Sequence, residues 1–407
     1  MSRINQFDIV IVGGGMVGLA MAASLAKSDL KVVLIERLAL NSAEISNTLA
    51  SAPNSSVDFD IRVSAISPRN QQFLSHLGAW SLLPAGRIAE YQKMFVWDGE
   101  SSGEIEFDAA EMAQKSLGSI IENRMLQAAL FQSIYQQGNI QILEQMEITE
   151  IENGKEQVVI KFESGREISS RLLIGADGGQ SQVRKLMGTA TLRSDYDQTA
   201  FVATVETAKP HQDTAWQRFT RYGPVAFLPL PIANLCSIVW SADQEQSEKI
   251  KQLDRQAFER ELAKAFEYRL GAVTLASEFR GFPLIKQHAE HYIKNRCILI
   301  GDAAHTIHPL AGQGVNLGFQ DAECLSQRIL ELVCKGRDFS NPLNLASFER
   351  ERKAHNKITQ EAMSGFKWLF GKRELPLIVA RSIGMSQLNR TTSLKNLIAS
   401  QAMGIST

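Results

Sequence analysis

The feature that most constrains this chain is a glycine-rich turn between an apolar strand and a helix near the N-terminus. The β-branched run at residues 9–12 predicts a buried strand, and the spacing Gly13-x-Gly15-x-x-Gly18 follows it directly. A helical pattern then leads to a second apolar run at residues 31–35. A strand, a glycine turn, a helix and a second strand in this order predict the start of a doubly wound α/β domain with a parallel sheet.

The residues of this turn suit a bound dinucleotide. Gly13 permits a tight turn, Gly15 lets the backbone approach a pyrophosphate, and Gly18 lets the helix pack closely on the strand. The N-terminus of the helix offers free N–H groups and a positive dipole end to phosphates. Glu36, at the end of the second strand, can accept hydrogen bonds from the two ribose hydroxyls of an adenosine. The alternative is a turn that serves packing alone, and the motif does not distinguish NAD from FAD.

Charge and cysteine usage exclude several classes of protein. Lys and Arg total 43 against 44 for Asp and Glu, and a net charge of −1 is unlike that of a general nucleic-acid binder. No run of 18 apolar residues occurs, so we expect no membrane-spanning helix. The four cysteines form no CxxC pair, which predicts a reduced, cytoplasmic protein without a zinc framework. The N-terminus lacks the basic start and the cleavage site of a signal peptide.

The rest of the chain alternates between strand and helix patterns. Residues 41–58 are rich in Ser and Asn and predict a surface loop. Short apolar runs predict a β-meander within 142–175 and further strands between 196 and 240. We also expect a helix over 254–270, a short buried strand over 297–300, a helix over 315–334, and helices after 345 with a break at Pro376.

Two more strand ends carry a carboxylate followed by small residues. Residues 172–178 read Leu-Leu-Ile-Gly-Ala-Asp-Gly, which places Asp177 at the end of a strand. Residues 298–305 read Ile-Leu-Ile-Gly-Asp-Ala-Ala-His, which places Asp302 at the end of another. A carboxylate in this position can hold a ribityl or ribose hydroxyl. The glycines after Pro309 lie where a helix begins, so their N–H groups can bind a flavin edge or a phosphate.

These three motifs, in this order and spacing, resemble those of the FAD-dependent aromatic hydroxylases, the single-component flavoprotein monooxygenases. Residues 308–321, HPLAGQGVNLGFQD, are similar to the signature of the ubiquinone-biosynthesis branch of that family. Residues 62–67, 96–98, 121–124 and 235–241 also resemble this branch, and the resemblance covers nearly the whole chain. It implies a Rossmann-like, three-layer flavin-binding α/β domain with a parallel sheet, interleaved with a β-sheet-rich substrate domain and followed by C-terminal helices.

The implied domains are discontinuous along the chain. The C-terminal helical region would cover 346–407. The substrate domain would take 76–99 and 185–284. The FAD-binding domain would take 1–75, 100–184 and 285–345.

The resemblance also assigns residues to the adenosine half of FAD. Glu36 would hold the adenosine ribose, and Arg37 would lie beside the adenine. The diphosphate would lie on the first turn, against Gly13, Gly15, Met16, Val17 and Gly18.

The flavin half would lie on the later motifs. Asp302 would hold the ribityl chain, and Asp177 is similar to a family acid that serves both FAD and NAD(P)H, its alternative being a purely structural turn. Arg62 and Arg124 resemble family arginines near the flavin phosphates and the approach path of the reductant, their alternative being surface ion pairs. The isoalloxazine would be lined by Pro309, Gly312, Gly314, Val315 and Asn316.

The activity implied is that of an FAD-dependent monooxygenase that hydroxylates a polyprenylated phenol in ubiquinone biosynthesis. It would use NAD(P)H and O2 through a flavin C4a-hydroperoxide. Within the branch, the chain most resembles enzymes that act on 2-polyprenylphenol at ring carbon 5. With no second dinucleotide fingerprint in the sequence, NAD(P)H would bind transiently across the flavin domain. The alternatives are another ring position, a small soluble phenol, and a non-catalytic scaffold subunit of a quinone-biosynthesis complex.

No general base stands out in the sequence. The candidates beside the flavin are His305, Pro309, Gly312 and Gln313, with the chemistry carried by FAD. His305 and His308 are spaced HxxH without an HExxH motif, which does not indicate a metal site. The alternative for His305 is that it packs the turn after Asp302.

The C-terminal region combines basic and aromatic residues. Residues 345–407 carry ten Lys/Arg and four Asp/Glu, and they include Phe366, Trp368 and Phe370. Such a segment suits peripheral contact with anionic lipid at the inner face of the membrane. The alternative is a pair of helices packed on the main domain, with the basic side chains in solvent.

Overall fold

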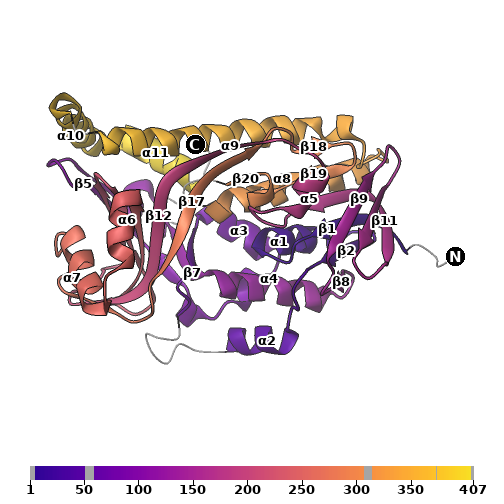
Figure 1. The fold of residues 1–407 in the computed structure, drawn as a ribbon, viewed down its shortest axis with the longest axis horizontal. Helices are drawn as coiled ribbons and strands as arrows, with labels where there is room; N and C mark the ends of the chain where they lie inside the picture. The colour runs from indigo at the N-terminus through magenta and orange to yellow at the C-terminus, as the bar shows by residue number, and fades with distance from the viewer. Residues whose placement is uncertain (1–4, 51–58, 307–313, 373, 405–407) are drawn as a thin grey trace.

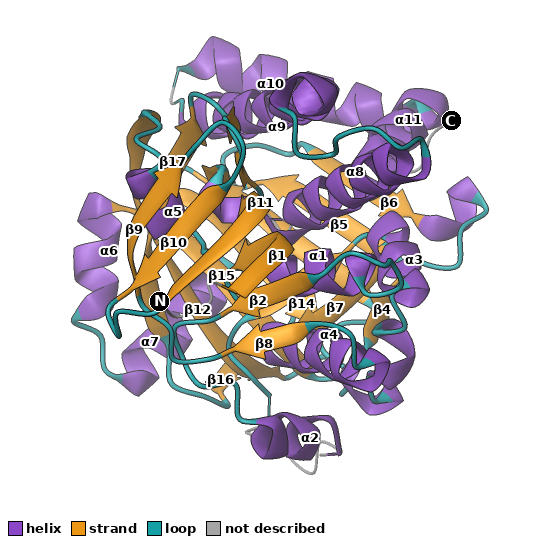
Figure 2. Ribbon diagram, turned by 90° about the vertical axis from the view of Figure 1, so that its right-hand side faces the viewer, coloured by secondary structure: helices purple, strands orange, loops and turns teal. Residues whose placement is uncertain are grey.

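Two large β-sheets, a small third sheet and surrounding helices make up the structure, a computed structural model that describes residues 5–50, 59–306, 314–372 and 374–404. Figure 1 shows the long helix α9 (Pro342–Gly371) extending past both large sheets. Figure 2 shows β8, β2, β1 and β11 side by side, with the second large sheet behind them.

The first sheet has a parallel core with the order β19-β11-β1-β2-β8. The side chains of Ile9, Val10 and Ile11 are fully buried, as expected for a parallel strand covered on both faces. Antiparallel strands β9 (Ile148–Asn153), β10 (Val158–Phe162) and β18 (Ile293–Lys294) join this core. The core strands are β1 (Asn5–Val12), β2 (Val32–Ile35), β8 (Gln141–Leu143), β11 (Glu167–Gly175) and β19 (Cys297–Leu299).

Helices cover one face of this sheet, and the β9–β10 hairpin with the short helix α5 (Gln182–Leu186) covers the other. Gly318 lets two of the helices approach closely, because a Cβ added there would lie 2.5 Å from a Val17 methyl carbon. The covering helices are α1 (Met16–Leu25), α3 (Pro68–His76), α4 (Asn123–Gln137) and α8 (Gly314–Cys334).

The expected surface loop at 41–58 is wrong for its first part. Residues Ser42–Ala50 form helix α2, and residues 51–58 lie outside the described part of the chain. Ile45 and Leu49, four residues apart, pack against the core on the side of α4. This apolar contact at helical spacing outweighs the Ser- and Asn-rich composition from which the loop was predicted.

The second large sheet has nine strands in the order β20-β17-β12-β15-β14-β13-β5-β6, with β16 paired to β12. Helices α6 (Gln244–Lys251) and α7 (Arg255–Ala265) pack on one of its faces. The expected strands between 196 and 240 all belong to it. Its strands are β5 (Lys93–Asp98), β6 (Glu104–Asp108), β12 (Thr191–Thr207), β13 (Thr214–Thr220), β14 (Gly223–Pro229), β15 (Leu235–Asp243), β16 (Val273–Leu275), β17 (Arg280–Ala289) and β20 (His305–Thr306).

The small third sheet joins β3 (Val63–Ile66), β7 (Gly118–Glu122) and β4 (Ala89–Tyr91). Its apolar residues Ala65, Tyr91 and Ile120 share a buried cluster with Ala226 and Leu228 of β14 in the nine-stranded sheet. The third sheet therefore links the two halves of the molecule.

Three helices end the described chain: α9, then α10 (Leu375–Arg390) and α11 (Thr392–Met403). The expected break is present, and Pro376 lies in the first turn of α10, where its missing N–H is not needed. Arg381 is buried and fixes α10 to β5 by donating to both carboxylate oxygens of Asp98, at 2.7 and 3.1 Å. The C-terminal helices are thus packed on the nine-stranded sheet.

Candidate functional site

The carboxyl ends of four parallel strands meet at one edge of the first sheet, and each is followed by a motif residue. Parallel strands place such ends together, which is where α/β proteins bind their ligands. The chain after β19 then crosses to the other large sheet through β20, so the Gly301–Ala303 turn lies between the two sheets. The motif residues gathered here are Gly13, Glu36, Asp177 and Asp302.

The glycines of the first turn have different requirements. Gly13 has φ +113°, and a Cβ there would lie 2.5 Å from the Ala176 carbonyl oxygen. A Cβ on Gly18 would lie 1.9 Å from the Gly13 carbonyl oxygen, so both positions are fixed by packing. A Cβ on Gly15 would meet no other protein atom within 4 Å, and Gly15 faces a cleft. This open backbone at the start of α1 fits a bound pyrophosphate.

That cleft has a volume of about 480 Å³ and lies between the parallel sheet and the nine-stranded sheet. Its size falls in the ~300–1,000 Å³ range of ligand pockets. One wall comes from the first sheet and its helices: Gly15, Met16, Val17, Ala176, Asp302, Gly314 and Val315. The opposite wall comes from β12, β15 and β17 and includes Ala200, Val202, Ser237, Val239 and Phe282.

Strand register selects the residues of this opposite wall. Val202 and Val239 pair across β12 and β15 and face the cleft. Their chain neighbours Phe201 and Trp240 point the other way, into the core beneath α6 and α7. The sequence gives no separate signal for these small wall residues, because alternation alone does not show which face meets a cofactor domain.

Glu36 is half-buried beside the first turn. One carboxylate oxygen accepts from the Gly14 backbone N–H at 2.5 Å, and the other from the Leu38 N–H at 2.9 Å. Each carboxylate oxygen can accept more than one hydrogen bond, so ribose hydroxyls can still bind. Arg37 next to it is exposed. This geometry fits the expected adenosine end.

Asp302 opens into the cleft and makes no hydrogen bond or salt bridge within the described residues. The surrounding protein raises the pKa of its carboxyl group, and nearby His305 and Arg62 oppose that rise only in part. A carboxyl group that faces a cleft and has no partner in the described part of the chain is suited to hold a ligand hydroxyl.

Asp177 differs from Asp302, because both of its carboxylate oxygens are engaged. It accepts from the Ser181 hydroxyl at 2.5 Å and from the backbone N–H groups of Gln182 and Val183 at 2.7 and 3.0 Å. Its neighbours Ala176 and Gly178 line the cleft. The geometry favours the structural alternative, in which Asp177 holds the start of α5.

The two expected arginines lie in different surroundings. Arg62 lines the cleft with its guanidinium 5.9 Å from the centre of the Phe282 ring. Arg124 pairs instead with Glu122 at 3.1 Å, and Glu122 also binds the buried Arg87 at 3.0 Å. The geometry therefore favours a ligand role for Arg62 and an ion-pair role for Arg124.

His305 belongs to a buried charge network rather than to the cleft wall. Its Nε2 lies 2.5 Å from a carboxylate oxygen of Asp321, which also accepts from the Gly301 N–H at 3.0 Å. Arg352 donates to the other oxygen at 2.7 Å, joined by Asn356 at 3.3 Å. Burial alone would raise the pKa of Asp321, but His305 and Arg352 hold it well below its usual range. The network fixes the turn that carries Asp302.

Sequence reasoning missed this network. Asp321 ends the 308–321 segment, but Arg352 lies 31 residues further on in α9, and no spacing rule links the two. A buried carboxylate with three side-chain partners is visible only once α8 and α9 are packed together.

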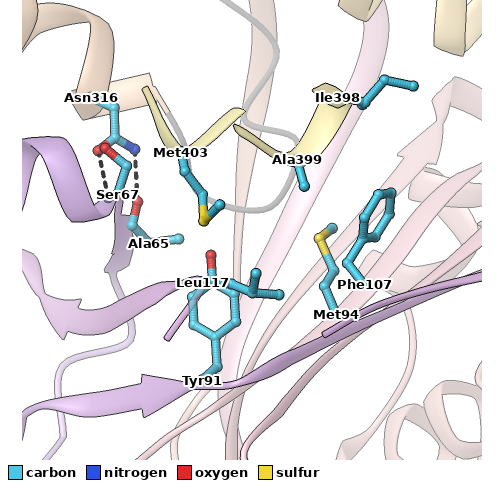
Figure 3. Close-up of a pocket in the computed structure, with 10 residues that line it drawn as sticks. All are labelled: Ala65, Ser67, Tyr91, Met94, Phe107, Leu117, Asn316, Ile398, Ala399 and Met403. Carbon is cyan, nitrogen blue, oxygen red and sulfur yellow. Dashed lines mark hydrogen bonds between the residues drawn. The ribbon is translucent and has the colours of Figure 1, made fainter. Parts of the chain in front are cut away.

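The start of α8 contributes backbone and one structural side chain. Gly314 and Val315 line the cleft. The Asn316 amide accepts from the Ser67 N–H at 3.1 Å and donates to the Ala65 carbonyl oxygen at 2.7 Å, so its side chain holds β3 (Figure 3). The expected site residues Pro309, Gly312 and Gln313, and also His308, lie outside the described residues.

Comparison with known proteins matches residues 6–362 to the FAD binding domain family. The chain is 34% identical to the 3-demethoxyubiquinol 3-hydroxylase of Escherichia coli (strain K12), over 98% of both proteins. It is 33% identical to the mitochondrial ubiquinone biosynthesis monooxygenase COQ6 of Danio rerio, over 98% of this chain and 90% of that protein.

Solved structures support the fold alone. The p-nitrophenol 4-monooxygenase PnpA from Pseudomonas putida DLL-E4 superposes with a TM-score of 0.77 at 16% identity, over 99% of this chain and all of that one. A probable FAD-dependent monooxygenase from Pseudomonas aeruginosa, pqsL, gives 0.75 at 19% identity, over 94% of this chain and all of that one. Their architecture agrees with the expected two-part flavin hydroxylase fold.

Proposed function

Since the chain belongs to the FAD binding domain family and is an FAD-dependent monooxygenase of the ubiquinone-biosynthesis hydroxylases, we propose that it hydroxylates the ring of a polyprenylated phenol at carbon 5. The observation that carries the proposal is the cleft itself. A dinucleotide-binding edge with Gly15 and Asp302 faces a wall of small, mostly apolar residues, including Val202 and Val239.

The described residues fit FAD along the whole edge. The open backbone at Gly15 would bind the diphosphate, Glu36 the adenosine ribose and Asp302 the ribityl hydroxyls. Bound FAD, reduced by NAD(P)H, would supply the activation of O2. The backbone of Gly314 and Val315 lies at the start of α8, where N–H groups can face the flavin.

The remaining residues of the cleft orient the substrate and exclude water. Ala200, Val202 and Val239 present methyl groups to the cleft, which would exclude water from the space beside a bound flavin. Arg62 is exposed at the cleft and could meet the phosphates of a transiently bound NAD(P)H. His305 is held in the Asp321 network, so we assign it no proton-transfer role.

A second ring position is the alternative to carbon 5. The name of the Escherichia coli relative places its own reaction at position 3. A small soluble phenol and a non-catalytic scaffold are the remaining alternatives. A scaffold would have no need for the open backbone at Gly15 or for the Asp302 carboxyl group, which has no partner among the described residues.

We propose the division of the chain that the family resemblance implies, into an FAD-binding domain, a substrate domain and a C-terminal helical region, with one adjustment. Strand β6 (Glu104–Asp108) pairs with β5 throughout its length. We therefore place it with the substrate domain, so that the FAD-binding domain resumes after it.

We also propose peripheral contact between the C-terminal helices and anionic lipid at the inner face of the membrane. In the described residues no helix has the length and apolar character needed to cross a bilayer. Three of the basic residues of this region, Arg352, Arg381 and Lys395, are buried in ion pairs and unavailable to lipid. Exposed apolar side chains join the remaining basic residues of the region in carrying the proposal: Phe366, Trp368, Leu375, Val379, Ile383, Leu394, Leu397 and Ile398 are all exposed.

Co-sedimentation with vesicles tests the lipid contact. The protein should pellet with anionic vesicles at low salt and much less with neutral ones. Equal, negligible pelleting with both would refute it, and a requirement for other quinone-biosynthesis proteins would point to a protein complex at this face.

The hydroxylase proposal is tested with the FAD-loaded protein. Aerobic NADH and NADPH consumption is measured with and without a 2-prenylphenol, and the product is analysed by mass spectrometry. Stimulated consumption with a product heavier by one oxygen atom supports the proposal, and NMR then places the new hydroxyl group. Bound FAD without stimulation by any phenol would refute hydroxylation, and a protein that binds no FAD would favour the scaffold.

A further inference from the structure

A second, smaller cavity lies beneath the C-terminal helix α11 and has a volume of about 80 Å³ (Figure 3). One end is polar and lies against Ser67 and Asn316 at the start of α8. The other end is apolar and lies between the β5–β6 hairpin and α11, where its wall is formed by Met94, Phe107, Ile398 and Ala399.

The polar end lies next to the large cleft. Along β3, Val63 and Ser64 line the cleft, whereas Ala65 lines the small cavity. At the start of α8 the same change occurs between Val315, which lines the cleft, and Asn316, which lines the cavity. The two spaces are therefore bordered by the same strand and the same helix start.

The Tyr91 hydroxyl points into the middle of this cavity (Figure 3). Tyr91 is only 7% exposed, and its hydroxyl has no hydrogen-bond partner among the described residues. Burial raises its pKa to about 12, so it is a hydrogen-bond donor at neutral pH. Buried polar groups normally have hydrogen-bond partners. A ligand oxygen in the cavity would supply the missing acceptor.

The apolar end continues to the protein surface. Ile398 lines the cavity and is also 41% exposed. On the same helix Leu394 and Leu397 are 48% and 49% exposed. A contiguous run of exposed apolar side chains marks a surface that meets an apolar ligand or phase. An apolar chain could therefore lie with one end in the cavity and the rest along α11.

We propose that this cavity binds the ring-proximal part of a prenyl chain, that Tyr91 donates a hydrogen bond to an oxygen on the ring, and that the chain leaves past Ala399 and Ile398. The inference rests on the proposed function, because it names the substrate class from which the chain comes. In a 2-prenylphenol the hydroxyl group and the chain are on adjacent ring carbons, so one site can hold both. The cavity is smaller than a whole-ligand pocket of ~300–1,000 Å³, as expected if only part of the chain is inside.

Four variants, one of them a control, separate the parts of this proposal. Ala399→Phe fills the apolar end, and Ala399→Leu does so with less bulk should the first variant fail to fold. Tyr91→Phe removes only the hydroxyl. Ser393→Phe adds the same ring at an exposed position of the same helix, outside the cavity and the apolar run, and is the matched control. Equilibrium dialysis of the FAD-loaded protein against 2-geranylphenol and against phenol measures binding separately from turnover.

The variant Ala399→Phe should weaken binding of 2-geranylphenol about tenfold, because the new ring would displace about two methylene groups of the chain from the cavity. Binding of phenol, which has no chain, should be unaffected. Tyr91→Phe should weaken binding of both phenols about fivefold, the loss of one neutral hydrogen bond. Ser393→Phe should change neither.

Two other outcomes separate this inference from the proposed function. If Ala399→Phe and Ala399→Leu alter neither phenol, or alter both equally, the cavity is not a chain site and the inference is overturned, whether or not the enzyme hydroxylates phenols. If 2-geranylphenol binds with the expected selectivity but no oxygenated product forms, the chain site stands and the hydroxylase proposal falls.

Discussion

Replacing Arg352 with Met should destabilise the protein strongly while retaining most of the side-chain volume. The Arg352 guanidinium is 5% exposed and lies 2.7 Å from the Asp321 carboxylate, which is fully buried. Removing one partner of such a pair leaves an uncompensated charge and costs about 3–5 kcal/mol. With a urea dependence of about 3 kcal/mol per molar, the unfolding midpoint should fall by about 1 M or more.

The effect should reach the cofactor through the Gly301 turn. Asp321 accepts from the Gly301 N–H, and the next residue is Asp302 in the cleft. A double variant, Arg352→Met with Asp321→Leu, removes both charges and should recover much of the lost stability. It also leaves the Gly301 N–H and His305 without their acceptor, so FAD retention should remain low even where stability recovers.

Urea unfolding followed by circular dichroism, with flavin content after desalting, measures both effects. Lys335→Met is the control, just after the end of α8, the helix of Asp321, since Lys335 and Glu331 form a salt bridge with side chains 58% and 43% exposed. Exposed pairs contribute about 0–1 kcal/mol. A midpoint for Arg352→Met equal to that of the control would refute the role of the buried pair. Recovery of FAD retention together with stability in the double variant would refute the positioning role.

Three further predictions concern single positions. Gly15→Ala should leave the urea midpoint nearly unchanged but lower the affinity for FAD. Gly18→Ala should lower both the midpoint and the affinity, because the added Cβ would lie 1.9 Å from the Gly13 carbonyl oxygen. Equal urea midpoints for the two variants would contradict this. Asp302→Ala should reduce flavin content after desalting in a folded protein, and unchanged content would remove the ribityl assignment. Burial lowers the pKa of His288 from 6.5 to about 4. Between pH 6.5 and 4 the unfolded chain therefore carries a proton on His288 that the folded chain does not. The free energy of unfolding should fall by up to about 3 kcal/mol as the pH drops through this range. In His288→Gln the unfolding midpoint should depend less on pH across this range. An unchanged pH dependence would show that other groups cause the loss of stability in acid.

The elements that sequence predicted well are those whose own residues determine them. The run at 9–12 is apolar on both faces and forms a fully buried parallel strand, and Gly13 and Gly18 have no room for a side chain. Helix α2 shows the opposite case. Its composition favours a loop, and two apolar residues that contact α4 decide its structure. Local pattern fails where a distant element supplies the deciding contact.

The same distinction separates the site residues. Glu36 and Asp302 follow strands directly, so their positions at the sheet edge come from local sequence and parallel topology. Asp177 also follows a strand, yet its carboxylate is taken up by Ser181 and the start of α5. Sequence spacing places a carboxylate at the edge, but it does not determine whether a backbone N–H or a ligand becomes its partner.

His305 shows why a catalytic role could not be inferred from proximity in the sequence. It lies three residues after Asp302, where a base near the flavin would be expected, but β20 turns it away and pairs its backbone with His288 of β17. Its ring then meets Asp321, which comes from α8 and is balanced by Arg352 of α9. The short link between the two large sheets is thus anchored by two helices that follow it in the chain. Because the C-terminal helix α9 supplies the balancing charge, contacts of the C-terminal region should influence the position of the Gly301–Ala303 turn.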